Sequence, residues 1–138
     1  MKKFLLLTLV SLLPFIANAM TDEEFGVLSL ECTLKQDMNA CDKILPVSQE
    51  RCNSGTIEAC AMASAVHVAH GKFDDAMTYA MKGCDLGDGN SCGITSVLYL
   101  ERRTNAITKE QAIANCQKAC DMTKSPIFCE AILKQLNK

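Results

Sequence analysis

Nine cysteines carry most of the chemistry available to this chain, because thiols bind metals, exchange electrons and form disulfides. In the segment GCDLGDGNSC, seven residues separate Cys84 from Cys92. Zinc-binding pairs usually have only about two to four residues between them, and thiol redox enzymes use C-x-x-C, which the chain lacks. The spacing predicts structural disulfides, with no metal and no cofactor. The nine are Cys32, Cys41, Cys52, Cys60, Cys84, Cys92, Cys116, Cys120 and Cys129.

The first residues, MKKFLLLTLVSLLPFIANAM, have the pattern of a secretory signal peptide. Lys2 and Lys3 precede an apolar run, and the triplet 17–19 (Ala-Asn-Ala) fits a cleavage site. The run contains Pro14 and is shorter than the roughly 20 residues that cross a bilayer, although a retained signal anchor is the alternative. We expect cleavage after Ala19, which gives a periplasmic or secreted protein without membrane contact. Disulfides persist in these oxidising compartments.

The charge balance argues against nucleic acid as a partner. Removal of Lys2 and Lys3 from the 14 basic residues leaves 12 basic against 16 acidic side chains. No basic patch remains to neutralise phosphates. Residues 20–138 are a suitable length for one domain, with a modest core because Trp is absent.

The cysteine pairs repeat along the chain. Cys52-x7-Cys60 and Cys84-x7-Cys92 are offset by 32 residues, and Cys120-x8-Cys129 follows 36 to 37 residues later. A period in the thirties is typical of stacked helix pairs. We therefore expect an all-α fold, a right-handed solenoid of antiparallel helix pairs. Its parts are an irregular unit 20–55, repeats 56–90 and 91–124, and a closing helix 125–138.

Two capping boxes mark helix starts, Thr21 with Glu24 and Thr108 with Gln111. In the segment 72–84, apolar residues recur every three or four positions, which indicates an amphipathic helix. No segment alternates apolar and polar residues convincingly enough to predict a strand. We expect about seven helices in all.

Other residues set the expected limits of individual helices. Thr56 is predicted to cap a helix that ends at His70, and Ser91 to open the next one. Pro46 is expected to break or kink the helix of residues 39–52. Pro126 is expected at the tolerated first position of the closing helix.

In such a stack, the last cysteine of one unit lies near the first cysteine of the next, across a short turn. Only closeness in sequence links Cys32 to Cys41. Cys116 could compete with Cys120 for Cys129, but it aligns with Ala80 of the preceding repeat and is expected to be a free thiol, available for a dimer. The predicted disulfides are Cys32–Cys41, Cys52–Cys60, Cys84–Cys92 and Cys120–Cys129.

The segment 76–99, AMTYAMKGCDLGDGNSCGITSVLY, resembles a helix junction of Sel1-like repeat proteins, in particular the Helicobacter cysteine-rich protein subfamily. The resemblance covers about 80 residues, 51–130, and weakens in the copy AIANCQKACDM. This chain departs from the family in having Ser64 and Ser96 at a small glycine position, and its N-terminal unit matches poorly. The matching positions are Ala76, Tyr79, Lys82, Cys84, Asp85, Leu86, Gly87, Cys92, Leu98 and Tyr99.

The resemblance implies a scaffold that binds a protein or peptide, such as a toxin neutralised in the periplasm or a host-facing factor. It also implies that the positions of His67 and Tyr99 lie toward a concave face. The predicted binding face is Ser64, His67, His70, Thr95, Tyr99, Arg102 and Arg103.

The same resemblance implies an alternative function, a β-lactam-binding protein with weak β-lactamase activity. The chain has no S-x-x-K, S-D-N or K-T-G set for an acyl-enzyme. Ser64 and His67, three residues apart, could act as nucleophile and base, but no orienting acid is evident. His67 and His70 could share a metal but lack a third ligand. We assign no catalytic residue, and a β-lactamase-like hydrolase stays the alternative to a non-enzymatic scaffold.

Overall fold

The computed structural model describes residues 19–124 and 126–138, and only the backbone at 126–128. The predicted signal segment lies outside the described residues, except for Ala19. The described residues form α-helices and no strand, and none of these helices is long and apolar enough to cross a membrane. The helices are α1 (Asp22–Leu34), α2 (Met38–Asn53), α3 (Ile57–Ala69), α4 (Phe73–Asp85), α5 (Gly89–Leu100), α6 (Lys109–Thr123) and α7 (Pro126–Leu136).

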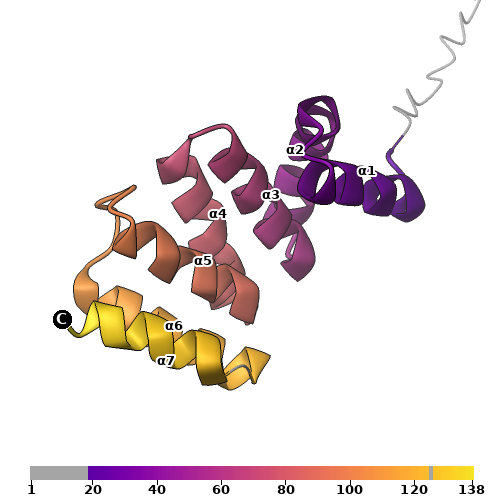
Figure 1. Ribbon diagram of the computed structural model, residues 1–138. Helices are drawn as coiled ribbons and strands as arrows, with labels where there is room; N and C mark the ends of the chain where they lie inside the picture. Colours follow the sequence, from indigo (N-terminus) through magenta and orange to yellow (C-terminus); the bar gives the residue numbers. More distant parts are fainter. Residues whose placement is uncertain (1–18, 125) are drawn as a thin grey trace, which may run out of the picture.

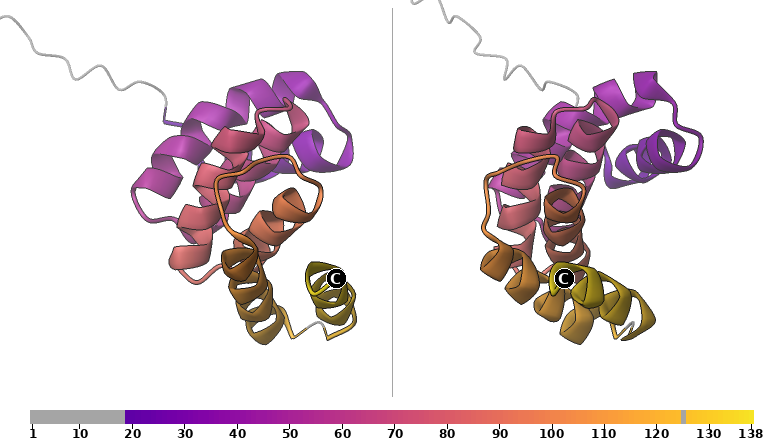
Figure 2. Two further views of the ribbon diagram at one scale, coloured as in Figure 1. Left: turned by 90° about the vertical axis from the view of Figure 1, so that its left-hand side faces the viewer. Right: turned by 60° about the vertical axis from the view of Figure 1, so that its left-hand side comes forward.

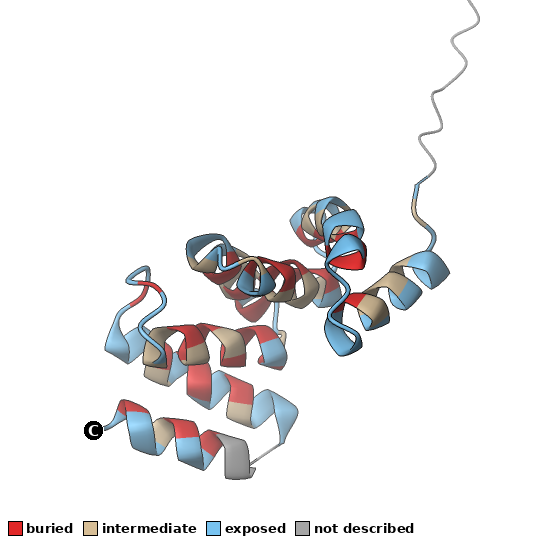
Figure 3. Cartoon of the chain, turned by 45° about the horizontal axis from the view of Figure 1, so that its top comes forward, coloured by how far each residue is buried: buried red, intermediate tan, exposed pale blue. Residues whose placement is uncertain are grey.

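The helices follow one another in sequence order, with α1 and α7 at opposite ends of the array (Figure 1). Each helix packs against the next one along the chain. Contacts between alternate helices place α1, α3, α5 and α7 in one row, and a contact between α2 and α4 begins a second row (Figure 2). Buried residues lie mainly on the faces that the helices turn toward each other (Figure 3).

Both predicted capping boxes are present. The Thr21 hydroxyl accepts from the Glu24 N–H at 3.1 Å, and the Glu24 carboxylate accepts from the Thr21 N–H at 2.9 Å. At α6, Thr108 and Gln111 make the same two bonds at 3.2 and 2.8 Å. Thr56 occupies the N-cap of α3, but its side chain makes no capping bond.

The predicted helix start at Ser91 and the predicted break at Pro46 are wrong. Helix α5 begins at Gly89, not Ser91, because the Asp88 carboxylate accepts from the N–H groups of Asn90 and Ser91 at 3.3 and 2.9 Å. Helix α2 continues through Pro46 as one element. Pro46 removes a single helical donor, the one for the carbonyl of Asp42, and both residues are exposed, so water can replace that bond.

Four disulfides join consecutive helices, and their pairs are those predicted. Their Cα–Cα distances run from 4.5 to 5.4 Å, within the range that a disulfide requires. Three of them connect an even-numbered helix to the odd-numbered helix that follows it, and one connects α1 to α2. They are Cys32–Cys41, Cys52–Cys60, Cys84–Cys92 and Cys120–Cys129.

Two helix pairs, α3 with α4 and α5 with α6, have no disulfide between them. In each pair a fully buried serine links the two helices instead. The Ser64 hydroxyl donates to the Ala76 carbonyl at 2.8 Å, and the Ser96 hydroxyl donates to the Ala112 carbonyl at 2.9 Å. Disulfides and buried serines therefore alternate along the array from α2 to α7.

The junction of α4 with α5 is packed too closely for any side chain at Gly83. A Cβ atom there would lie 2.7 Å from the Cβ of Ser91 and 2.9 Å from the Cβ of Cys60. Glycine is needed because three helices meet at this point. The segment GCDLGDGNSC is thus a tight helix junction fixed by its own disulfide.

Candidate functional site

Three of the seven residues of the predicted binding face are buried between helices, so their assignment to a ligand-facing row is wrong. Ser64 and Thr95 are fully buried, and His67 is only 4% exposed. The Thr95 hydroxyl donates to the Cys92 carbonyl at 2.7 Å and accepts from the Asn115 amide at 3.0 Å. These polar side chains connect helices, and no ligand can reach them in this packing.

His67 lies in a cluster of side chains from α2, α3 and α4. Its ring stacks on Tyr79 with centroids 5.4 Å apart, and its Nε2 is 3.0 Å from the Gln49 amide nitrogen. A donor amide at that distance requires Nε2 to accept, which leaves the proton on Nδ1. Nδ1 is buried without a hydrogen-bond partner, 4.0 Å from an Asp75 oxygen. Burial lowers the pKa of His67, opposed in part by Asp75, so the ring is neutral at neutral pH.

This geometry does not support Ser64 and His67 as a nucleophile and base. The Ser64 hydroxyl donates to Ala76 in α4, and the His67 Nε2 is occupied by Gln49. A nucleophile must also reach its substrate, and Ser64 is fully buried. The second histidine, His70, contacts Asp42 of α2 through its Nε2 at 3.0 Å. No group of three or more metal-ligating side chains gathers among the described residues.

The remaining predicted residues lie near the far end of α5. Tyr99 and Arg102 line a hollow of about 680 Å³ that also includes Lys109 of α6. The Arg103 guanidinium lies 4.9 Å from the centre of the Phe73 ring and donates to Glu101 at 3.4 Å. The predicted row is therefore not one continuous face.

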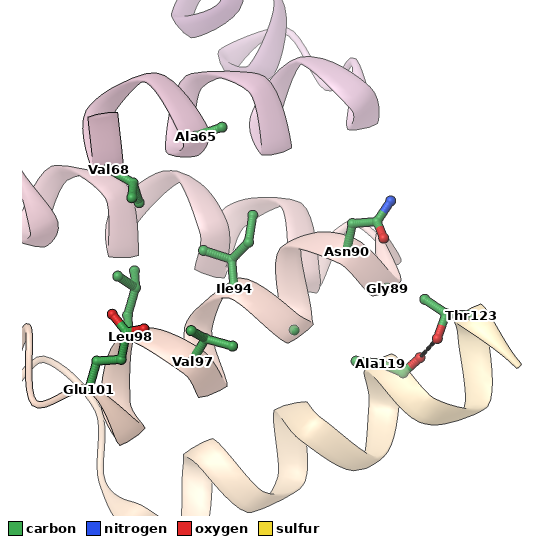
Figure 4. A pocket seen from close by; sticks show the side chains of 11 residues that line it. Ala65, Val68, Gly89, Asn90, Ile94, Val97, Leu98, Glu101, Ala119 and Thr123 are labelled. Atoms are coloured by element: carbon green, nitrogen blue, oxygen red, sulfur yellow. Dashed lines mark hydrogen bonds between the residues drawn. The ribbon is translucent and has the colours of Figure 1, made fainter. Parts of the chain in front are cut away.

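An apolar groove lies between α3, α5 and α6, with a volume of about 600 Å³. Figure 4 shows Ala65 and Val68 of α3 on one side, Ile94 and Val97 of α5 along the middle, and α6 opposite. Its full lining is Ala65, Val68, Gly89, Asn90, Gly93, Ile94, Val97, Leu98, Glu101, Ala119 and Thr123.

Small residues bring the walls of this groove together. A Cβ atom at Gly89 would lie 2.8 Å from Met122 and 2.9 Å from Thr123, so the start of α5 touches the end of α6. The Thr123 hydroxyl donates to the Ala119 carbonyl at 2.7 Å, which satisfies it within α6 (Figure 4). The groove therefore offers mainly apolar surface, with Asn90 at the start of α5 and Glu101 just after its end as polar members.

This groove was not predicted from the sequence. The signal that could have found it is the four-residue spacing of Gly89, Gly93 and Val97, which places two small residues and one apolar residue on one side of α5. The burial of neighbouring Thr95 and Ser96 shows that the other side of α5 is covered by other helices.

Cys116 is the cysteine without a disulfide, and all nine cysteines are described. It is 2% exposed and belongs to a core cluster with Met77 and Leu98. Burial raises the pKa of its thiol. The expected dimer through Cys116 does not fit this packing, because a second chain would reach the sulfur only if α6 left the core.

The site is thus a three-walled apolar groove on a helical array, in which the buried polar side chains hold helices together. The Sel1-like resemblance rests on the sequence around Cys84 and Cys92 and stays a prediction. Comparison of the chain with protein-family models, with curated proteins and with solved structures yields no match.

Proposed function

We propose that this chain is an exported helical-repeat scaffold, a right-handed solenoid of Sel1-like helix pairs, that binds a protein or peptide partner. Four disulfides fit an oxidising compartment, and the signal-like residues 1–19 would direct the chain there. The equivalent serine bonds of α3–α4 and α5–α6 support two repeats of one plan. Such arrays present extended surfaces for partners.

The groove between α3, α5 and α6 carries this proposal. Its volume of about 600 Å³ lies in the range of ligand sites and accommodates several apolar side chains of a peptide. Its walls are tied to their neighbours, because Cys92 links α5 to α4 and Cys120 links α6 to α7. A surface fixed before binding loses little conformational entropy on association. The expected ligand is a peptide segment with two or more apolar anchor residues.

A displayed peptide library panned on the oxidised protein tests the proposal. We expect enriched peptides to share apolar anchors and to shift the NMR methyl signals of Val68, Ile94 and Val97. Val68→Glu or Val97→Glu should weaken binding by roughly tenfold or more, because a carboxylate in an apolar contact must lose its water. Both valines are partly exposed, so the fold should tolerate these changes.

Leu86→Glu is the matched control, because Leu86 is 40% exposed and does not line the groove. It should leave the affinity unchanged. Enriched peptides that bind all three variants as tightly as the wild type would refute the groove as the binding site.

We do not propose β-lactam hydrolysis, because no observation favours it. Ser64, the serine that would act with His67, is buried and donates a hydrogen bond to the Ala76 carbonyl. A polypeptide ligand matches an open groove with mainly apolar walls better than a β-lactam does.

A further inference from the structure

Helix α1 has apolar residues on two opposite sides. Phe25, Leu28 and Cys32 face the neighbouring helices and belong to the core. Val27, Leu30 and Leu34 are 52%, 58% and 77% exposed. Their spacing of three and four residues places them on one side of the helix. We call these three residues the α1 stripe.

The α1 stripe lies at one end of the array (Figure 1). Helix α1 packs on α2 and α3, and no other described element covers its outer side. At the other end, the exposed described residues of α7 include Glu130, Lys134 and Gln135. Terminal units of helical arrays need polar outer faces to remain soluble. The α1 end has three exposed apolar residues among its polar ones, which points to a surface that another molecule covers.

Gly26 supports the same reading. It lies inside α1, where glycine costs about 0.5 to 1 kcal/mol relative to alanine, and nothing lies within 4 Å of where its Cβ would be. The chain itself therefore has no packing need for glycine at this position. Gly26 precedes Val27 and lies one helical turn from Leu30, so it borders the α1 stripe. A missing side chain lets the backbone of a second helix approach closely.

The charges on α1 indicate which kind of molecule would cover the α1 stripe. The helix contains four acidic residues and no basic residue, and Glu23 and Glu31 lie one turn before and one turn after Val27. Glu31 is paired with Lys35, just beyond the end of the helix, at 3.5 Å, and a cationic partner would compete with that exposed lysine. The adjoining hollow, of about 570 Å³, is lined by Glu23 and Glu24 with three apolar residues and with one cation, Lys43 of α2. A second copy of the chain would bring like charges together, whereas a cationic partner would gain attraction.

We propose that the α1 stripe binds a cationic amphipathic helix of a partner protein, with apolar residues on the stripe and lysine or arginine beside Glu23 and Glu31. The mode is one helix packed along the outer face of another, with apolar contact along the stripe and complementary charge beside it. This surface is separate from the groove of α3, α5 and α6.

A synthetic helical peptide of Leu and Lys with a single Trp in its apolar face is the probe. The chain has no Trp, so Trp emission reports the peptide alone. We expect a saturable blue shift on addition of the full-length oxidised protein, reduced by salt. The same peptide with Glu in place of Lys should bind roughly tenfold or more weakly.

Variants of α1 locate the contact. Leu30→Asp, the double change Glu23→Lys with Glu31→Lys, and Gly26→Leu should each weaken binding of the Lys peptide by roughly tenfold. Glu50→Lys with Glu130→Lys is the matched control, since it reverses two exposed charges on α2 and α7. It should retain nearly full affinity. Circular dichroism confirms the fold of each variant.

Three results would overturn the proposal. One is equal affinity for the Lys and Glu peptides. Another is undiminished binding by all of the folded α1 variants. The third is a concentration-dependent dimer in sedimentation that Leu30→Asp abolishes, which would make a second copy the occupant. Val97→Glu should leave binding of the Lys peptide unchanged, so the groove and the α1 stripe are tested independently.

Discussion

At the scale of single residues, buried polar side chains form hydrogen bonds that join neighbouring helices. Ser64, Thr95 and Ser96 each donate a hydrogen bond to a main-chain carbonyl, so their burial is compensated. His67 differs, because its Nδ1 is the buried side-chain atom without a partner among the described residues. Its uncharged form is the one that this environment tolerates.

We expect the free energy of unfolding to fall as the pH drops below 6.5, the ordinary pKa of histidine. The folded protein lowers the pKa of His67, so the unfolded chain takes up the proton first, and protonation favours unfolding. Asp75 opposes this effect, while Lys72 and His70 reinforce it. The stabilising contribution is complete above pH 6.5 and is lost progressively below it.

Urea unfolding at about pH 7.5 and about pH 5 measures the effect. His67→Gln cannot titrate, so its stability should change less between the two conditions than that of the wild type. Identical changes in both proteins would contradict a role for His67.

The sequence identified Ser64 and His67 as polar residues of interest, but it did not predict which way their side chains face. Ser64 and His67 were placed on a ligand-facing row because the Sel1-like resemblance implies that the position of His67 lies toward a concave face. The alignment of the repeats shows which residues share one side of a helix, but only the packing decides which side a neighbouring helix covers. Here α4 covers Ser64, and Gln49 and Tyr79 cover His67.

At the scale of elements, local signals were strong where a side chain caps its own helix. Thr21 and Thr108 predicted the starts of α1 and α6, because a capping box involves only four consecutive residues. Ser91 failed as a start because Asp88, a better acceptor, lies three residues earlier. Pro46 does not break α2, because the one helical hydrogen bond that it removes lies at an exposed position where water can replace it.

We expect Ser64→Ala and Ser96→Ala to destabilise the protein by similar amounts, about 1 kcal/mol each. Each change deletes the hydrogen bond between the two helices of a pair that has no disulfide. Because the two sites lie in different pairs, the double variant should show the sum. Urea unfolding monitored by circular dichroism provides the values.

Ser29→Ala is the control for this comparison. The Ser29 hydroxyl donates to the Phe25 carbonyl of the same helix, so its removal leaves every hydrogen bond between helices intact. A loss at Ser29 equal to the losses at Ser64 and Ser96 would argue against a special role for the bonds between helices.

At the scale of the whole molecule, disulfides link α2 to α3, α4 to α5, and α6 to α7, while serines link the intervening pairs. The cysteine spacing predicted the disulfides of this pattern but not the serine hydrogen bonds. The groove could not be predicted from spacing, because its lining residues come from three helices and become neighbours only when those helices pack.

Replacement of both Cys84 and Cys92 by alanine should destabilise the protein by roughly 2 to 3 kcal/mol, since the unfolded chain gains the freedom of an opened loop. Helix content should remain nearly unchanged, because the helices themselves lose no hydrogen bond. Thermal unfolding by circular dichroism measures both quantities. The single variant Cys116→Ala controls for loss of a buried sulfur without loss of a disulfide. An equal decrease in both proteins would show that the disulfide adds nothing beyond packing.

The short reach of the disulfides has a consequence for how this protein acquires its structure. Each one joins cysteines only 8 or 9 positions apart in sequence. Eight cysteines can pair in roughly a hundred ways, yet the native arrangement needs contacts only between helices that adjoin in the chain. Oxidation can therefore proceed in order along the chain, and little reshuffling of mispaired thiols is required.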